Sequence, residues 1–140
     1  MPAVRQQINI SVPVRTVWKA LTTEEGVTSW WVDEARLDAR AGGRIVLKSE
    51  GDEGEVVEER GMFHEVLPTR RIEIAWDGNS PAATKGTRIE FSVARDGTET
   101  RVSVVHSGSG APFDDEGARA ALDKTWKQAL HALRDHLEAP

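Results

Sequence analysis

The chain begins with residues that alternate between polar and apolar, and it then changes to helical spacing. In residues 7–12 every second residue is apolar, so the apolar side chains share one face. This alternation predicts a first strand that ends at a proline. Residues 14–21 repeat apolar positions at helical spacing and predict a short helix. A second short helix is predicted to follow, capped by Thr22 or Thr23 and ending near Trp30.

Six further stretches alternate with a period of two, which is typical of half-buried strands. Turn signals separate them, such as Gly42-Gly43 and Asp96-Gly97. In the longest stretch, Gly61 marks an expected bulge or bend. The predicted strands cover residues 32–38, 44–49, 55–67, 71–76, 87–94 and 98–106, with polar loops at 77–86 and 107–112.

Residues 115–138 carry one apolar stripe at helical spacing and start with acidic residues. A helix of this length extends ~36 Å at 1.5 Å per residue, enough to cross an antiparallel sheet. The order of strand, two short helices, six strands and one long helix predicts an α+β fold, with a curved antiparallel sheet of about seven strands. Because a curled sheet does not close fully onto a straight helix, we expect a cavity between them.

Composition narrows the class of protein. The 140 residues suit one domain, 1–140, and the net charge of −5 without a basic block argues against nucleic-acid binding. No apolar run reaches the ~20 residues of a membrane helix, so membrane insertion is not expected. The absence of cysteine excludes disulfides and cysteine-ligated metals. With no secretory signal at the start, the expected location is cytoplasmic.

Five of the eight aromatic residues are tryptophans, and two of them are adjacent. Neighbouring side chains at a helix end point about 100° apart, so Trp30 and Trp31 are not expected to enter the same packing site. We expect Trp30 to anchor the short helices in the core with Trp18. Trp31 is then expected to line a pocket mouth with Trp76 and Trp126. The alternative, that all five simply fill the core, remains open at this point.

An ordered set of motifs then resembles a known superfamily. The motifs are Pro13-x-x-x-Val17-Trp18-x-Ala20-Leu21-Thr22, Trp30-Trp31, Gly42-Gly43-Arg44, Gly61 through Pro68, Trp76, Gly86-Thr87 and Trp126. Together they resemble the helix-grip fold of the START and birch-pollen-allergen-like (SRPBCC) superfamily. Within it, the chain is similar to the bacterial homologues of the activator of heat-shock-protein-90 ATPase. The sequence departs from that branch at His106-Ser107-Gly108, where a bulky apolar residue often follows the glycine.

The resemblance implies a sheet that grips the C-terminal helix around an internal cavity. The same fold hosts lipid carriers, cyclases and chaperone activators, so it implies no single activity. It also brings no catalytic signature, and no cofactor is expected.

The alternation of side chains along the predicted strands directs three polar residues towards the expected cavity. His106 shares a face with Val102 and Val104, His64 with Met62 and Val66, and Asp33 with Ala35 and Leu37. Two imidazoles and a carboxylate can act as general acid and base, or as a weak metal site. They come from separate strands without local ligand spacing, so ordinary hydrogen-bonded wall residues are the favoured interpretation and no metal is predicted.

The leading hypothesis is binding of a small hydrophobic or aromatic ligand between the sheet and the C-terminal helix. The alternatives are a chaperone-activator-like interaction module and a cyclase- or dehydrase-like enzyme. We expect a monomer or weak homodimer, with a small apolar molecule as partner and a chaperone as the alternative partner. The predicted ligand-binding residues are Trp31, Asp33, Leu47, His64, Trp76, Phe91, His106, Trp126 and Leu130.

Overall fold

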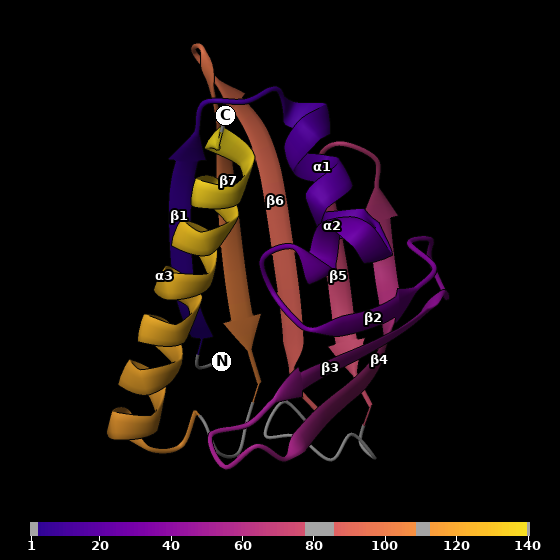
Figure 1. The fold of residues 1–140 in the computed structure, drawn as a ribbon, viewed down its shortest axis with the longest axis vertical. Helices are drawn as coiled ribbons and strands as arrows, with labels where there is room; N and C mark the ends of the chain where they lie inside the picture. The colour runs from indigo at the N-terminus through magenta and orange to yellow at the C-terminus, as the bar shows by residue number, and fades with distance from the viewer. Residues whose placement is uncertain (1–2, 78–85, 109–112, 140) are drawn as a thin grey trace.

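In the computed structural model, which describes residues 3–77, 86–108 and 113–139, seven strands form one antiparallel sheet. The strand order is β1-β7-β6-β5-β4-β3-β2, so β2 to β7 follow one another as a meander and β1 joins beside β7. Figure 1 shows this sheet behind the long helix α3. The elements are β1 (Ala3–Ile10), α1 (Val14–Thr22), α2 (Glu24–Thr28), β2 (Glu34–Leu37), β3 (Arg44–Glu50), β4 (Val56–Leu67), β5 (Arg71–Trp76), β6 (Arg88–Asp96), β7 (Glu99–Ser107) and α3 (Glu116–Glu138).

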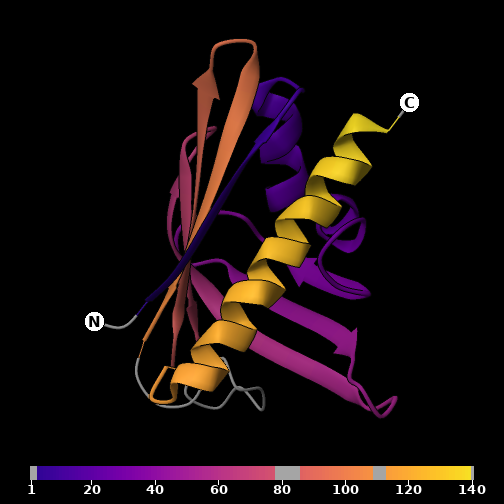
Figure 2. The same cartoon turned by 90° about the vertical axis from the view of Figure 1, so that its left-hand side faces the viewer.

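The sheet curves around α3, as the sequence predicts. In Figure 2, β3 and β4 cross at an angle to β1, while α3 runs diagonally over the concave side. The helix packs most heavily against β1, while α1 packs against β6 and β7. The predicted α+β arrangement of a curved sheet around a C-terminal helix is confirmed.

The core follows the alternation read from the sequence. Ile89, Phe91 and Val93 of β6 are buried, and they pack with the buried stripe of α3. Within that stripe, Leu130 and Leu133 are almost fully buried, because both fall on the face turned to the sheet. Asp115 caps α3 by accepting a hydrogen bond from the Ala118 N–H at 2.8 Å.

The observed ends of some strands and helices differ from the predicted ones. β1 begins at Ala3, four residues before the predicted start, because its pairing with β7 continues from Ile10 back to Ala3. Thr23 is the cap of α2, and its hydroxyl accepts a hydrogen bond from the Gly26 N–H at 2.9 Å. That helix ends at Thr28, before the tryptophan pair. The loops predicted at 77–86 and 107–112 lie largely outside the described residues.

The irregularity in β4 lies three residues after the position expected from the sequence. Pairing with β5 is regular at Gly61 and shifts between Phe63 and Glu65. Phe63 and Val66 therefore both face the core, although they are three residues apart. Between them the alternation of inward and outward side chains that a regular strand shows is interrupted. This shift decides which side chains of β4 reach the interior.

Candidate functional site

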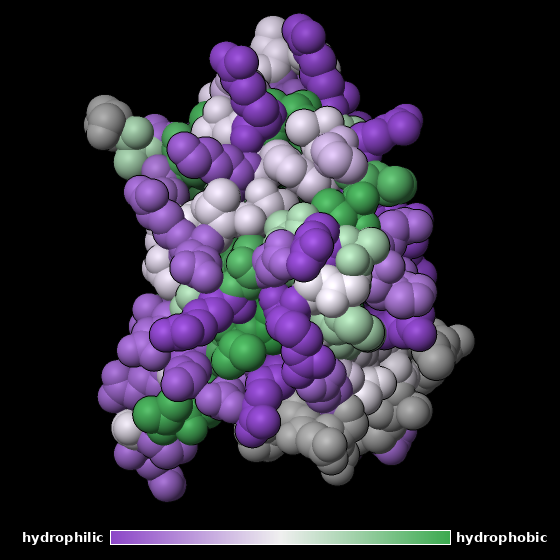
Figure 3. All heavy atoms as spheres, turned by 90° about the vertical axis from the view of Figure 1, so that its right-hand side faces the viewer, coloured by the Kyte–Doolittle hydropathy of each residue, from purple (hydrophilic) through white to green (hydrophobic). Residues whose placement is uncertain are grey.

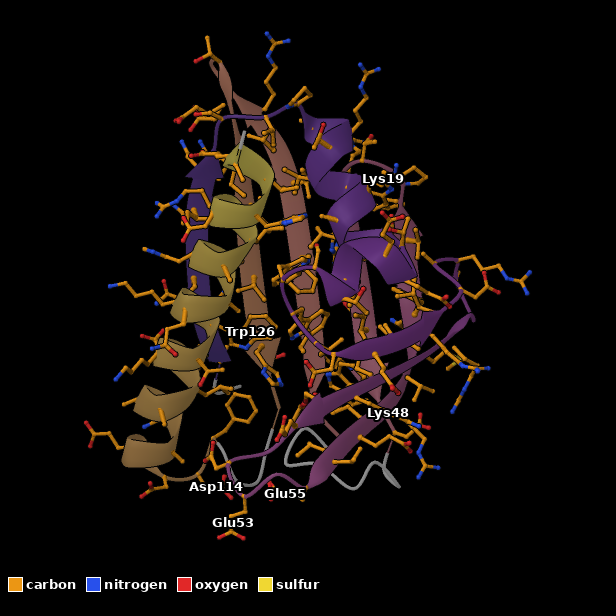
Figure 4. The ribbon with its side chains drawn as sticks, viewed as in Figure 1. Lys19, Lys48, Glu53, Glu55, Asp114 and Trp126 are labelled. Carbon is orange, nitrogen blue, oxygen red and sulfur yellow. The ribbon has the colours of Figure 1, made fainter. Side chains whose placement is uncertain are left out.

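A partly open pocket of about 260 Å³ lies between the first half of α3 and the sheet. Its apolar wall consists of two indoles and the aliphatic side chains around them. Figure 4 shows one of these indoles, Trp126, pointing from α3 towards the sheet. The lining residues are Trp31 and Val32 before β2, Ser49 of β3, Glu59 of β4, Ile89 of β6, His106 of β7, and Leu122, Thr125, Trp126 and Ala129 of α3.

Aromatic rings pack together along one side of this pocket. Trp30 and Trp31 are stacked, with ring centroids 5.4 Å apart and planes 20° apart. Phe91 meets Trp31 edge-on at 5.5 Å. Trp126 lies 5.7 Å from the Trp31 centroid at a tilt of 50°. These rings form one cluster that is continuous with the core.

The expectation that the adjacent tryptophans occupy different packing sites is wrong. They follow the end of α2 and lie in a turn, where the Trp31 N–H donates to the Val27 carbonyl oxygen at 3.0 Å. The rotation of about 100° between neighbouring side chains therefore does not keep two rings as large as indoles apart. The separate roles expected of the two residues are nevertheless visible. Trp30 is buried and donates through Nε1 to the Ala20 carbonyl oxygen at 2.9 Å, whereas Trp31 is half-buried and lines the pocket.

His106 lies inside, at the end of β7, as its parity predicts. Trp126 Nε1 donates a hydrogen bond to His106 Nδ1 at 3.1 Å, and His106 Nε2 lies 2.8 Å from the Thr87 hydroxyl oxygen. Because Nδ1 accepts, the neutral ring carries its proton on Nε2 and donates it to Thr87. Burial lowers the pKa of His106 from 6.5 to about 4. Both ring nitrogens are therefore engaged in holding neighbouring side chains.

Glu59 of β4 contributes a carboxylate to the pocket, although it is not among the ligand-binding residues predicted from the sequence. It pairs across the sheet with Leu47, which is fully buried, so the two side chains share the inner face. The signal was present in the sequence, because Glu59 lies two residues before Gly61 and four before Phe63 on the regular part of β4. Ser49 and Thr125 add hydroxyl groups to the same lining and were also missed.

The expectation that His64 faces the interior is wrong. Its side chain is 59% exposed, and Nδ1 lies 2.9 Å from a carboxylate oxygen of Glu73 on the outer face of the sheet. Arg88 binds the same Glu73 oxygen at 3.0 Å. The shift in pairing after Phe63 separates His64 from the parity of Val66, which is the physical reason for the error.

The expectation that Asp33 faces the cavity is also wrong. Asp33 precedes β2 and is exposed, and its carboxylate accepts a hydrogen bond from the Glu50 N–H at 3.0 Å. It borders a separate groove of about 380 Å³ beside the β3–β4 hairpin, where Glu34 and Lys48 add further charges. That groove is larger than the pocket under α3, but its charged, solvent-facing walls offer less apolar surface to a ligand.

The remaining predicted ligand residues belong to the core behind the pocket. Leu47, Trp76, Phe91 and Leu130 are buried and do not border the open volume. Phe91 contributes to the pocket indirectly, because its ring makes edge-on contacts with the two indoles that line it, Trp31 and Trp126. Of the nine predicted residues, the structure brings Trp31, His106 and Trp126 together at the pocket.

Two further properties concern metals and membranes. Within residues 3–77, 86–108 and 113–139, no group of three or more His, Cys, Asp or Glu side chains is arranged to hold a metal ion. Among the helices in those same ranges, none has the length and apolar character needed to cross a membrane.

Solved structures of other proteins share this architecture. The chain is similar to the Aha1 dimer from Colwellia psychrerythraea, with 24% identity over 99% of this chain and 98% of that chain and a TM-score of 0.80. It is similar to protein MLL2253 from Mesorhizobium loti, with 20% identity over 97% and 96% of the two chains and a TM-score of 0.78. The AHSA1-like protein from Aeromonas hydrophila has 18% identity over 97% and 93% and a TM-score of 0.77. At these identities the likeness shows the shared helix-grip fold alone.

A comparison with curated proteins gives no match. The family model for the Activator of Hsp90 ATPase homolog 1-like protein matches residues 11–138, which is most of the chain. The resemblance found in the sequence is thereby confirmed. The chain belongs to the family of Activator of Hsp90 ATPase homolog 1-like proteins.

Proposed function

We propose that this protein binds a small, mainly apolar or aromatic molecule in the pocket under α3. The observation that carries the proposal is the pair of indoles, Trp31 and Trp126, which face a common open volume and are supported from behind by Phe91. Mostly apolar walls with a few polar groups are the usual pattern of small-molecule sites. Here Ser49, Glu59 and Thr125 are added as polar groups.

The volume of the pocket limits the size of the ligand. About 260 Å³ lies just below the ~300–1,000 Å³ range of ligand sites. It exceeds the ~150 Å³ of an apolar cavity that accepts benzene. A molecule with one or two rings and a short substituent therefore fits this proposal better than a long-chain lipid.

The hydrogen bonds that His106 already makes favour ligand binding over catalysis. A general base needs a free lone pair within reach of the substrate, and Nδ1 already accepts from Trp126 while Nε2 donates to Thr87. The low pKa of the ring comes from burial and not from an ionised partner. His106 thus acts here as a support for Trp126.

The family match favours a second candidate, a chaperone-activator-like interaction module. Such a module uses its outer surface and does not require the pocket. The large hydrophobic residues that are exposed in the described ranges, Val56, Met62 and Leu67, all lie on β4. Figure 3 shows the side of the molecule that lies to the right in Figure 1, where hydrophilic side chains predominate and hydrophobic groups form small patches. The expected monomer or weak homodimer and the cytoplasmic location stay predictions.

A titration with neopentylbenzene, followed through the tryptophan side-chain N–H signals in ¹⁵N–¹H NMR spectra, tests the binding proposal. We expect the Trp31 and Trp126 signals to shift with a common dissociation constant, because both rings border the pocket. Trp31→Ala should weaken binding about tenfold, since an aromatic contact contributes ~0.5–1.5 kcal/mol beyond its buried area.

Trp18→Ala provides the matched control, because Trp18 is also a half-buried indole against the core but lies on α1 outside the pocket. This variant should bind as the wild type does. Equal weakening in both variants, or no shift at Trp31 and Trp126, contradicts the proposal. Stimulation of an Hsp90 ATPase that persists undiminished in Trp31→Ala would move the function to the interaction module.

A further inference from the structure

Thr87 does not border the pocket but is hydrogen-bonded to a residue that does. It immediately precedes β6 and is 1% exposed, and its hydroxyl oxygen lies 2.8 Å from His106 Nε2. His106 in turn accepts a hydrogen bond from the Trp126 indole N–H at 3.1 Å. A buried chain of two hydrogen bonds thus connects Thr87 to an indole that forms part of the pocket wall.

The direction of both hydrogen bonds follows from the chemistry of the groups. An indole N–H can only donate, so His106 Nδ1 must be the nitrogen of the ring that carries no proton. The proton of the neutral imidazole is then on Nε2, and the Thr87 hydroxyl oxygen must accept it. Of the two tautomers of His106, the Thr87 hydroxyl therefore stabilises the one that can hold Trp126.

Packing holds both partners of this hydrogen bond in place. The His106 ring lies edge-on to Phe113, with ring centroids 5.3 Å apart, and edge-on to Trp126 at 6.0 Å, so it cannot turn without disturbing both contacts. Thr87 lies against the backbone of Gly108, where a Cβ would be only 2.9 Å from Thr87 Cγ2. The glycine of His106-Ser107-Gly108 therefore allows the close approach that places Thr87 next to His106.

We propose that Thr87 is a positioning residue of the pocket, which sets the affinity for the ligand through His106 by holding the Trp126 ring in place. This inference rests on the proposed function, because it concerns the same pocket. Without the Thr87 hydroxyl, the Nε2 proton of His106 loses its acceptor, and moving that proton to Nδ1 deprives the Trp126 N–H of its acceptor instead. The indole can then regain a partner by turning towards water in the open volume, so the ligand must order this wall when it binds.

Thr87→Val tests this inference, because valine keeps the shape of threonine and lacks the hydroxyl. Neopentylbenzene is titrated by NMR into the wild type and the variant, and the Trp126 indole N–H signal and the imidazole ¹⁵N signals of His106 are followed. We expect about three- to tenfold weaker binding in the variant, which corresponds to the cost of ordering one side chain. Already without ligand, the Trp126 signal should shift upfield and the His106 proton should move from Nε2 to Nδ1.

Two further variants separate the role of this hydroxyl from a general loss of stability. Thr87→Ser keeps the hydroxyl and should bind neopentylbenzene within about twofold of the wild type. Thr100→Val is the matched control, because Thr100 is also 1% exposed and its hydroxyl donates to the Val12 carbonyl oxygen at 2.6 Å, away from the pocket. This control should leave the affinity and the Trp126 signal unchanged.

The outcomes separate this inference from the proposed function. Wild-type affinity in Thr87→Val, or weaker binding with unchanged Trp126 and His106 signals, refutes the positioning role while the proposed function stands. Equal weakening in Thr100→Val or in Thr87→Ser refutes it as well. A His106 proton found on Nδ1 in the wild type refutes it without any variant. If neopentylbenzene does not bind the wild type, the proposed function fails and this inference fails with it.

Discussion

The buried imidazole of His106 makes the stability of this protein depend on pH. The ring is 1% exposed, and burial lowers its pKa from 6.5 to about 4 in the folded state. In the unfolded chain the ordinary value returns, so the unfolded state binds more protons between those two pH values. The stabilisation from a neutral His106 is therefore fully present above pH 6.5 and is lost as the pH falls towards 4.

The magnitude follows from the shift and from the surroundings of the ring. Trp126, Thr87 and the edge of Phe113 pack around His106, and none of them carries a charge that would hold an imidazolium ion. One pKa unit corresponds to about 1.4 kcal/mol, so lowering the pH from 6.5 to 5 removes about 2 kcal/mol of unfolding free energy. The loss approaches about 3 kcal/mol near pH 4.

Urea unfolding followed by tryptophan fluorescence, at pH 7.5 and pH 5, measures this loss. With a slope of about 2 kcal/mol per molar urea, the wild-type midpoint should fall by about 1 M from this group alone. His106→Gln serves as the comparison, because its amide can still accept from Trp126 and does not titrate. Subtracting its change cancels the contributions of all other titrating groups.

We expect His106→Gln to be less stable than the wild type at pH 7.5 but to lose about 2 kcal/mol less on acidification. An equal loss in the two proteins would refute the reasoning, because it would mean that His106 is already charged in the fold or is protonated without cost.

Two further predictions concern the packing and capping that hold the elements in place. Gly61→Ala should destabilise the protein by about 1–3 kcal/mol in urea unfolding, because a Cβ there would lie 2.6 Å from the Ala75 carbonyl oxygen and 2.8 Å from Trp76 Cε3. Gly117→Ala is its control and should cost far less, since its Cβ would meet only the capping carboxylate oxygen of Asp115, at 3.1 Å, and alanine favours the helical conformation. Asp115→Ala should cost about 1 kcal/mol by removing the cap of α3, and an unchanged unfolding midpoint would contradict the assigned cap.

The regular elements could be predicted because their burial pattern is local. In β6 every second residue from Ile89 to Val93 is buried, and in α3 the stripe through Trp126, Leu130 and Leu133 faces the sheet. A period of two or of 3.6 residues is sufficient information in such segments. The order of these elements was then enough to predict a curved sheet around a helix.

The candidate site was harder to predict than the regular elements, because it depends on where the regular pairing of the strands is interrupted. The pairing shift after Phe63 leaves His64 on the outer face with Met62 while Val66 turns inward, and this overturns the assignment of His64 made from the sequence. The bend before β2 exposes Asp33 in the same way. Neither change leaves a clear mark in the sequence, since the hydrogen bonds that fix a bulge or a bend come from a neighbouring strand.

Hydrogen bonds at the indoles explain how an aromatic cluster can leave a pocket unfilled. Trp30 is held through Nε1 by the Ala20 carbonyl oxygen, and Trp126 is held by His106, which is held in turn by Thr87. Rings anchored in this way cannot turn into the open volume without leaving a buried N–H unpaired, which costs about 1–3 kcal/mol. The walls are therefore arranged before a ligand enters, and little of the binding energy is spent on ordering them. The same tryptophans thus complete the core and define the site.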